Sequence, residues 1–254
     1  MSFVGRKALV TGASRGLGKA ISHKLASQGC SVLLVSRNED LLRQQVKDLP
    51  QLSTSQKHDF VSLDLNDLII SPDKKKHLSS YLGDVSILVN CAGVTNHSLL
   101  YRLEDSEIIS TINLNLIAPI LLSKLLYKPM LKLSKESINK SQPISQILNI
   151  SSILSLTETN VPGTSVYSAS KAGILGFTKS LSAEFKGKVR VNSILPGLIR
   201  DTDMGAGASS SLSDKSISLD HVVSKSMDIL LDDSVNGQCI ICDNEPTKKF
   251  EFTS

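Results

Sequence analysis

The sequence of 254 residues contains no tryptophan, and aromatic residues make up only 4% of it. Proteins that hold single-stranded nucleic acids stack the bases on aromatic rings, so this scarcity argues against such a platform. The net charge of +4 is too small and too evenly spread for a nucleic-acid groove. It is compatible with an acidic partner or a polyphosphate ligand.

Cysteine is also scarce. Four cysteines do not suggest a disulfide-stabilised secreted scaffold in a chain of this length. Cys239 and Cys242 form a C-x-x-C, but they lie in an apolar run that predicts a buried strand, where residues three apart point to opposite faces. Because the histidines show no ligand spacing either, we expect no metal site.

No apolar run has the length of a membrane span, and no signal-peptide core precedes the first expected strand. We therefore expect a soluble protein with no membrane span. Only the six residues MSFVGR precede that strand, which leaves little room for an organelle-targeting presequence.

Hydrophobic residues make up 41% of the chain and charged residues 20%, as in a globular protein with a large core. Apolar runs alternate with helical patterns, which predicts an α/β fold. We expect a single domain over residues 1–254, with a Rossmann-type doubly wound parallel sheet of about seven strands and helices on both faces. The strands are expected at 7–12, 31–36, 58–63, 85–90, 145–151, 188–195 and 237–243.

A glycine loop, TGASRGLG at 11–18, follows the first strand and precedes the helical pattern KAISHKLASQG. In such a loop Gly12 permits a tight turn, Gly16 lets the backbone approach a pyrophosphate and Gly18 lets the helix pack closely. A glycine pattern alone also fits a structural turn. Its placement between strand and helix favours a dinucleotide site.

Arginine stands where an acidic residue would bind the ribose hydroxyl of NAD. Arg37 follows the second strand, and Arg15 lies inside the glycine loop. Two guanidinium groups can bind a 2′-phosphate, which favours NADP. The alternative is that both are solvated surface arginines. Glu39 and Asp40 are interpreted as first-turn residues of a helix capped by Asn38.

Tyr167 and Lys171 lie four residues apart on an expected helix, Thr164–Phe185. That spacing places both side chains on one face, so a lysine ammonium can lower the phenol pKa from about 10 toward neutrality. Such a pair alone also fits a solvated helix surface. The same helix carries small residues at helical spacing that predict a subunit interface: Ala169, Ala172, Gly173, Gly176, Ser180 and Ala183.

Other candidate residues follow strand ends, where ligands of parallel sheets gather. Asp64 is expected to bind an adenine amino group, and one of Ser151 and Ser152 to face the crevice of Tyr167. Asn90 begins the segment NCAG and has two interpretations, as a ribose contact or as a link between strands. The segment 205–218 has the composition of a lid.

A helical pattern at Glu104–Leu133 is expected to be interrupted at Pro119 and Pro129. Pro119 has no N–H for the carbonyl of Asn115, which is then free to hold a water beside Tyr167. Pro119 equally fits a kink that adapts the helix to the sheet. Four lysines follow at helical spacing and predict a wet face or a contact for an acidic partner: Lys124, Lys128, Lys132 and Lys135.

In this order, TGASRGLG, NCAG, Asn115, NISS, YSASK and the Pro196–Gly197 pair resemble the short-chain dehydrogenase/reductase family over essentially the whole chain. The resemblance implies that Tyr167 is the proton donor, that Lys171 lowers its pKa and holds a ribose, that Ser152 binds the substrate carbonyl and that Asn115 anchors a relay water. The residues it implies for NADPH are Gly12, Ser14, Arg15, Gly16, Leu17, Gly18, Arg37, Asp64, Leu65, Asn90, Ala92, Gly93, Tyr167, Lys171, Pro196, Gly197, Ile199 and Thr202.

Within the family, NISSIL, VPGTSVYSASK and PGLIRDTDM resemble the 3-oxoacyl-[acyl-carrier-protein] reductases, in particular the fungal mitochondrial form. This implies NADPH-dependent reduction of carrier-protein-bound or other 3-oxoacyl thioesters in type II fatty acid synthesis. It also implies a homo-oligomer, dimer or tetramer, in the mitochondrial matrix, with the cytoplasm as the alternative. Two other functions stay open: reduction of quinones, sugars or other small carbonyl compounds, and a catalytically silent NADPH-binding subunit.

The sequence departs from the family pattern in four places, one of which is that the stretch from Pro196–Gly197 to Thr202 is one residue longer. Ser152 precedes Tyr167 by 15 positions, more than in the bacterial enzymes. The segment expected to form the lid is short, and Asp243–Asn244 stands where the family has a glycine pair. These departures place loop geometry and subunit contacts in question, while the residue roles stay as implied.

Overall fold

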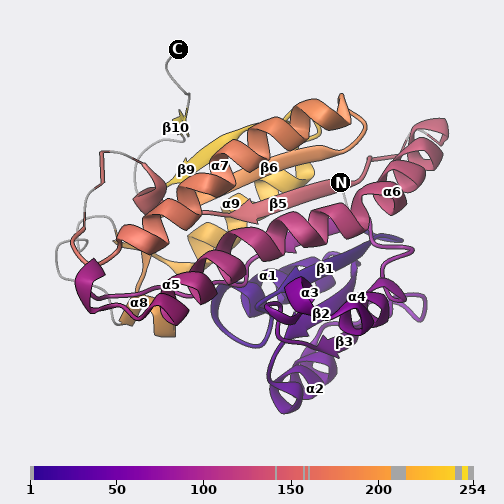
Figure 1. Ribbon diagram of the computed structural model, residues 1–254. Helices are drawn as coiled ribbons and strands as arrows, with labels where there is room; N and C mark the ends of the chain where they lie inside the picture. Colours follow the sequence, from indigo (N-terminus) through magenta and orange to yellow (C-terminus); the bar gives the residue numbers. More distant parts are fainter. Residues whose placement is uncertain are drawn as a thin grey trace.

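The computed structural model describes residues 3–140, 142–156, 158–159, 161–206, 216–243 and 248–250. Its main sheet has the order β10-β9-β6-β5-β4-β1-β2-β3 (Figure 1). All neighbours pair in parallel except β10, which pairs antiparallel with β9. The predicted Rossmann-type parallel sheet is therefore confirmed. The strands are β1 (Lys7–Thr11), β2 (Ser31–Ser36), β3 (Asp59–Ser62), β4 (Ile87–Asn90), β5 (Gln146–Ile150), β6 (Arg190–Pro196), β9 (Cys239–Cys242) and β10 (Lys248–Phe250).

Helices cover both faces of this sheet, as predicted. On one face, α1 (Gly16–Ala26), α2 (Glu39–Asp48) and α9 (Leu219–Leu231) contribute to one buried apolar cluster. On the other, α3 (Asp67–Ile70), α4 (Pro72–Ser79), α6 (Ala118–Asn139) and α7 (Ser165–Phe185) contribute to a second cluster. Because both faces are covered, the central strands are apolar along most of their length.

Helix starts follow local sequence signals. Asn38 accepts a hydrogen bond from the amide of Leu41 and caps α2, as predicted. Ser71 and Ser218 cap α4 and α9 in the same way. Cys239 and Cys242 lie buried on opposite faces of β9, in two different apolar clusters, as predicted for that strand. In the described part of the chain, no group of three or more His, Cys, Asp or Glu side chains is placed to hold a metal ion.

One long helix runs without a break from α5 (Asp105–Ile112) through a π-helical turn, η2 (Asn113–Ile117), into α6. The predicted interruption at Pro119 and Pro129 is wrong. The amide of Ala118 bonds the carbonyl of Asn113, five residues earlier, so the bonding pattern has already changed just before Pro119. The helix therefore continues past Pro119 although this residue donates no backbone hydrogen bond.

This helix, Asp105–Asn139, is also long and apolar enough to cross a membrane, judged by length and composition alone. Its most apolar window has a mean hydropathy of 1.6, and 33% of that window is buried. The prediction that no stretch has span length therefore missed it. Helices that pack on a sheet or on another subunit pass the same test, so the finding is weak evidence for a span.

Several short elements have no counterpart in the prediction. They are α3, β10, η1 (Leu100–Arg102), η3 (Ile153–Ser155), α8 (Asp203–Ala206) and a small parallel pair, β7 (Leu198–Ile199) with β8 (Ser216–Ile217). The segment expected to form a lid, 205–218, begins in α8 and ends in β8. Its middle, 207–215, lies outside the described residues, as does Asn244 of the pair that replaces the family's glycines.

Candidate active site

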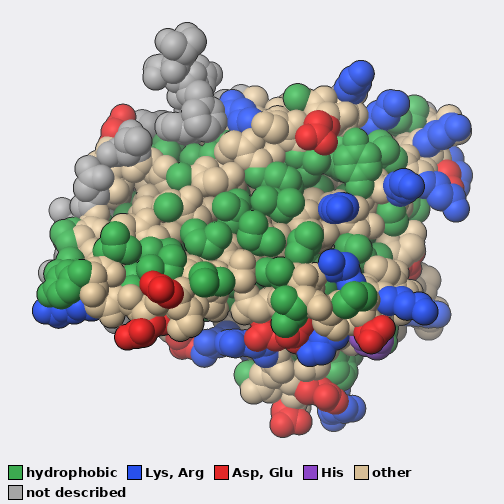
Figure 2. All heavy atoms as spheres, in the orientation of Figure 1, with side chains coloured by type: hydrophobic (Ala, Val, Ile, Leu, Met, Phe, Trp, Pro, Cys, Tyr) green, Lys and Arg blue, Asp and Glu red, His purple; other side chains and the backbone are tan. Residues whose placement is uncertain are grey.

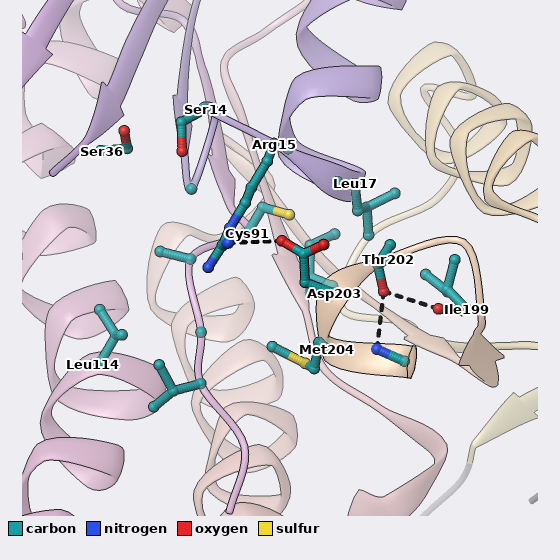
Figure 3. A pocket seen from close by; sticks show the side chains of 18 of the residues that line it. Ser14, Arg15, Leu17, Ser36, Cys91, Leu114, Ile199, Thr202, Asp203 and Met204 are labelled. Atoms are coloured by element: carbon teal, nitrogen blue, oxygen red, sulfur yellow. Dashed lines mark hydrogen bonds and ion pairs between the residues drawn. The ribbon is translucent and has the colours of Figure 1, made fainter. Parts of the chain in front are cut away.

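A cavity of about 720 Å³ lies beyond the carboxyl ends of β1, β2, β4, β5 and β6. It is open to the surface and is lined by the loops that follow those strands (Figure 3). In a doubly wound sheet this crevice, where the strand order reverses, is where ligands bind. The order here reverses between β1 and β4.

The glycine loop is packed so closely that side chains are excluded at two positions. Gly12 has a φ of +66°, and a Cβ there would lie 2.9 Å from the Cα of Ala92. A Cβ on Gly18 would lie 2.4 Å from the carbonyl oxygen of Gly12. The Thr11 hydroxyl accepts hydrogen bonds from the amides of Cys91 and Ala92, at 3.0 Å each, and so joins this loop to NCAG. The predicted turn and close helix packing are thus present.

The two arginines proposed for a 2′-phosphate both line the cavity. Each lies near a carboxylate: Arg15 Nη1 is 2.6 Å from Asp203 Oδ2, and Arg37 Nη1 is 4.0 Å from Asp64 Oδ2. Ser36, the last residue of β2, has a buried hydroxyl oxygen with no hydrogen-bond partner among the described residues. A buried polar atom without a partner is costly, so this hydroxyl suits a ligand oxygen.

The structure brings together every residue predicted for the cofactor except one. Asn90 is buried and donates from Nδ2 to Asn149 Oδ1 at 2.8 Å, which links β4 to β5. Of the two interpretations of Asn90, the link between strands is the one the geometry shows. The predicted residues that line the cavity are Gly12, Ser14, Arg15, Gly16, Leu17, Gly18, Arg37, Asp64, Leu65, Ala92, Gly93, Tyr167, Lys171, Pro196, Gly197, Ile199 and Thr202.

Tyr167 and Ser152 meet at the inner end of the cavity. Tyr167 comes from the first turn of α7, and its phenol lies close enough to the hydroxyl of Ser152, the N-cap of η3 after β5, for that hydroxyl to influence the phenol pKa. Burial raises the pKa of the Tyr167 phenol above its usual value, although the Ser152 hydroxyl opposes this. The prediction that the pKa is lowered is therefore wrong for the protein without ligands, because desolvation is the largest influence.

Lys171 lies one turn along α7, with its Nζ 5.9 Å from the centroid of the Tyr167 ring. The Nζ donates to the carbonyl of Ile150 at 2.8 Å. Burial lowers the pKa of Lys171 from 10.5 to about 8, partly opposed by Cys91. The amine therefore changes charge near physiological pH.

Asn115 is buried in the π-helical turn behind the cavity and does not line it. Its Oδ1 accepts from the amide of Val94 at 2.9 Å, and its Nδ2 donates to the carbonyl of Val94 at 2.8 Å. A Cβ on Gly93 would lie 3.2 Å from Asn115 Oδ1 and 3.4 Å from Lys171 Nζ, so this glycine packs against both side chains. The side chain of Asn115 positions the loop after NCAG.

A second, smaller cavity of about 60 Å³ adjoins Tyr167 and Ser152. Most of its lining is apolar, and Met204 borders both cavities. A small carbonyl group entering it would meet the two hydroxyls. Its other lining residues are Thr95, His97, Ile153, Leu154, Val161, Thr164, Gly197 and Leu198.

Sequence reasoning missed six polar or sulfur-bearing residues of the larger cavity: Ser36, Asn38, Cys91, Asp201, Asp203 and Met204. Ser36 and Cys91 stand at strand ends, next to residues that were identified, so the strand-end rule could have found them. Asp203 and Met204 lie in a short helix with no local signal. Burial raises the pKa of Cys91 to about 12, which keeps its thiol protonated at neutral pH.

A family model described as short chain dehydrogenase matches residues 6–212. The 3-oxoacyl-[acyl-carrier-protein] reductase FabG of Chlamydia muridarum is 38% identical over 212 residues, which are 82% of this chain and 79% of that protein. Carbonyl reductase family member 4 of Danio rerio is 32% identical over 245 residues, 94% of this chain and 96% of the relative.

Among solved structures, a short chain dehydrogenase from Burkholderia cenocepacia in complex with NADP has a TM-score of 0.79 and 25% identity. The likeness covers 96% of this chain and 98% of that one. The fold, the glycine loop and the joined Ser152, Tyr167 and Lys171 agree with these matches. The chain is therefore an oxidoreductase of the short-chain dehydrogenase family.

Proposed function

We propose that the protein uses NADPH to reduce the 3-oxo group of an acyl thioester carried on acyl carrier protein. The observation that carries this proposal is the meeting of the Tyr167 and Ser152 hydroxyls where the larger cavity adjoins the small apolar one. A cofactor in the first cavity and a ketone in the second would share these two groups.

NADPH fits the larger cavity. Its 2′-phosphate needs cationic and hydroxyl donors, and the guanidinium groups of Arg15 and Arg37 with the unpartnered hydroxyl of Ser36 supply them. The glycine loop brings backbone amides to the start of α1, which suits a pyrophosphate. Related structures that bind NADP support the same choice.

When bound, the nicotinamide supplies a hydride to the carbonyl carbon. The Tyr167 phenol donates a proton to the oxygen, and its raised pKa keeps that proton in place at neutral pH. The Ser152 hydroxyl stabilises the same oxygen by a hydrogen bond. The Lys171 ammonium, beside the phenol, stabilises the phenolate that forms. A water on the backbone carbonyl of Asn115 would then return the proton.

Two substrate classes are supported by different relatives. The Chlamydia muridarum relative is a reductase of carrier-protein thioesters, whereas the Danio rerio relative is named a carbonyl reductase. The small volume of the second cavity, about 60 Å³, accommodates a ketone and its nearest carbons in either case. The compartment, mitochondrial matrix or cytoplasm, and the single domain over 1–254 stay predictions.

The proposal is tested by steady-state reduction assays with purified protein. We expect the highest kcat/KM with NADPH and acetoacetyl carrier protein, lower values with acetoacetyl thioesters of small thiols, and lower ones again with quinones and free sugars. A preference for free carbonyl compounds would favour the second function. NADPH binding without turnover of any ketone would favour the catalytically silent subunit.

We also infer that α7 forms a subunit interface. Small residues occupy its exposed side: Ala169, Ala172, Gly176, Ser180 and Ala183. Hydrophobic side chains gather on the same side of the molecule, over α5 to α7 (Figure 2). Gly173, which was predicted to belong to this stripe, instead faces Leu116 of η2, where a Cβ would lie 2.8 Å from the leucine side chain.

Replacing Gly176 with Arg is expected to dissociate the oligomer, because a Cβ at this position meets open space in the isolated chain and the added charge would enter the interface. Sedimentation velocity on wild type and variant measures the effect. Ser165→Arg, at the exposed start of the same helix, is the control for added charge. A wild-type monomer, or an unchanged oligomer in Gly176→Arg, would contradict this interface.

A further inference from the structure

An ion pair crosses the mouth of the larger cavity. The Arg15 guanidinium, from the glycine loop, lies 2.6 Å from the carboxylate of Asp203 in α8, although the two residues are 188 positions apart. Figure 3 shows the two side chains pointing toward each other across the opening. Arg15 is one of the two cations proposed for the 2′-phosphate, so the carboxylate occupies a donor that the phosphate needs.

The pair is weak enough to be exchanged. The side chains of Arg15 and Asp203 are 70% and 72% exposed, and exposed ion pairs contribute little to stability because water and salt screen them. A phosphate carries more charge than a carboxylate and binds guanidinium groups in a fork-like geometry. It can therefore displace Asp203 from Arg15.

Release of Asp203 would also affect the small cavity proposed for the substrate. Asp203 and Met204 are neighbours in α8, and Met204 borders both the larger cavity and the small one beside Tyr167. The helix is tied to the loop before it, because the Thr202 hydroxyl donates to the carbonyl of Ile199 and accepts from the amide of Gly205. Release of Asp203 thus frees one of the contacts that hold Met204 in place.

We propose that Asp203 is a specificity-determining residue: its carboxylate holds Arg15 in the protein without cofactor and gives it up to the 2′-phosphate of NADPH. The inference rests on the proposed function, because it presupposes that Arg15 binds this phosphate. NADH lacks the phosphate and leaves the ion pair intact. With NADPH bound, Asp203 of α8 is therefore released from Arg15, whereas with NADH bound it stays paired with Arg15.

A double-mutant cycle tests this exchange, with binding of NADPH and NADH followed by nicotinamide fluorescence at low salt. We expect Asp203→Asn to lower the Kd for NADPH by about 2- to 5-fold, the range of an exposed ion pair. The Kd for NADH stays unchanged. In the Arg15→Ala background, where no pair exists to be broken, Asp203→Asn is expected to leave the Kd for NADPH unchanged.

Asp201→Asn is the matched control. It removes the same charge from the turn just before α8, at another position that lines the larger cavity, and among the described residues Asp201 forms no ion pair within 4 Å. If Asp203→Asn tightens NADPH equally with and without Arg15, or if Asp201→Asn has the same effect, the carboxylate acts by general repulsion and the exchange is refuted. If wild-type protein binds NADPH but the cycle shows no coupling between Arg15 and Asp203, the exchange is refuted and the proposed function stands. If wild-type protein does not bind NADPH, the proposed function is refuted as well.

Discussion

Substituting Tyr167 with Phe is expected to lower kcat for ketone reduction by roughly 10²- to 10⁴-fold, the usual contribution of a positioned general acid. The substitution removes one hydroxyl from a buried ring and keeps the packing of that ring against Leu154. Ser152 would keep its place at the start of η3, but it would lose the phenol hydroxyl beside it. The loss is therefore expected in the chemical step, with the Kd for NADPH close to wild type.

The measurement is single-turnover reduction at saturating NADPH, with cofactor binding followed separately. Tyr127→Phe is the matched control, because Tyr127 stacks on Phe185 at 4.5 Å between ring centroids, in the core between α6 and α7. It removes the same atom from a ring outside the cavity. Turnover at the wild-type rate in Tyr167→Phe would remove the phenol from the mechanism.

Substituting Lys171 with Met is expected to abolish reduction and yet stabilise the fold by about 3 kcal/mol at pH 7, from 1.36 kcal/mol per pKa unit. Lys171 is 4% exposed, and its ammonium donates a hydrogen bond to a neutral carbonyl, that of Ile150. The folded protein therefore bears the cost of a desolvated charge. Methionine has a similar length and no charge, so it removes that cost.

This gain has a defined pH dependence. The pKa of Lys171 is about 8 in the folded protein and 10.5 as the ordinary value for the unfolded chain. Below pH 8 both states are charged and the full cost is present. Between pH 8 and 10.5 the unfolded state binds more protons, so wild-type stability rises relative to the variant, and above that range the difference disappears.

Urea unfolding followed by far-ultraviolet circular dichroism at several pH values between 7 and 10.5 measures this difference, since the chain has no tryptophan to report by fluorescence. Burial raises the pKa of Cys30 to about 12, and this thiol destabilises both proteins alike at high pH, so its effect cancels in the comparison. Lys132→Met, at an exposed position of α6, is the control and should show no such trend. A difference that grows with pH would contradict the assignment.

Local signals in the sequence were sufficient for much of the molecule. The glycine loop, the Asn38 cap, the seven parallel strands and the clustering of Ser152, Tyr167 and Lys171 all follow from spacing within a few residues or from strand ends. These features depend on backbone geometry and on the general rule for parallel sheets. The family resemblance added their roles.

The remaining features depend on contacts between distant segments. The pKa of Tyr167 is set by how much water reaches the phenol, which the spacing to Lys171 cannot give. Asn90 donates a hydrogen bond to Asn149 on the next strand, and Gly173 packs against the side chain of Leu116 on another helix. The Arg15 and Asp203 pair joins segments 188 residues apart. Each of these requires the packed fold.

The π-helical turn at Asn113–Ile117 is, in effect, one residue of surplus chain inside an otherwise regular helix. Deleting a single residue here is expected to restore regular winding with α6 still in phase with α5, because five residues of a π-helical turn rotate the chain by about as much as four residues of an α-helix. The side chain of Asn115 would then lose its place opposite Val94. The helix can make this contact only because it is locally overlong.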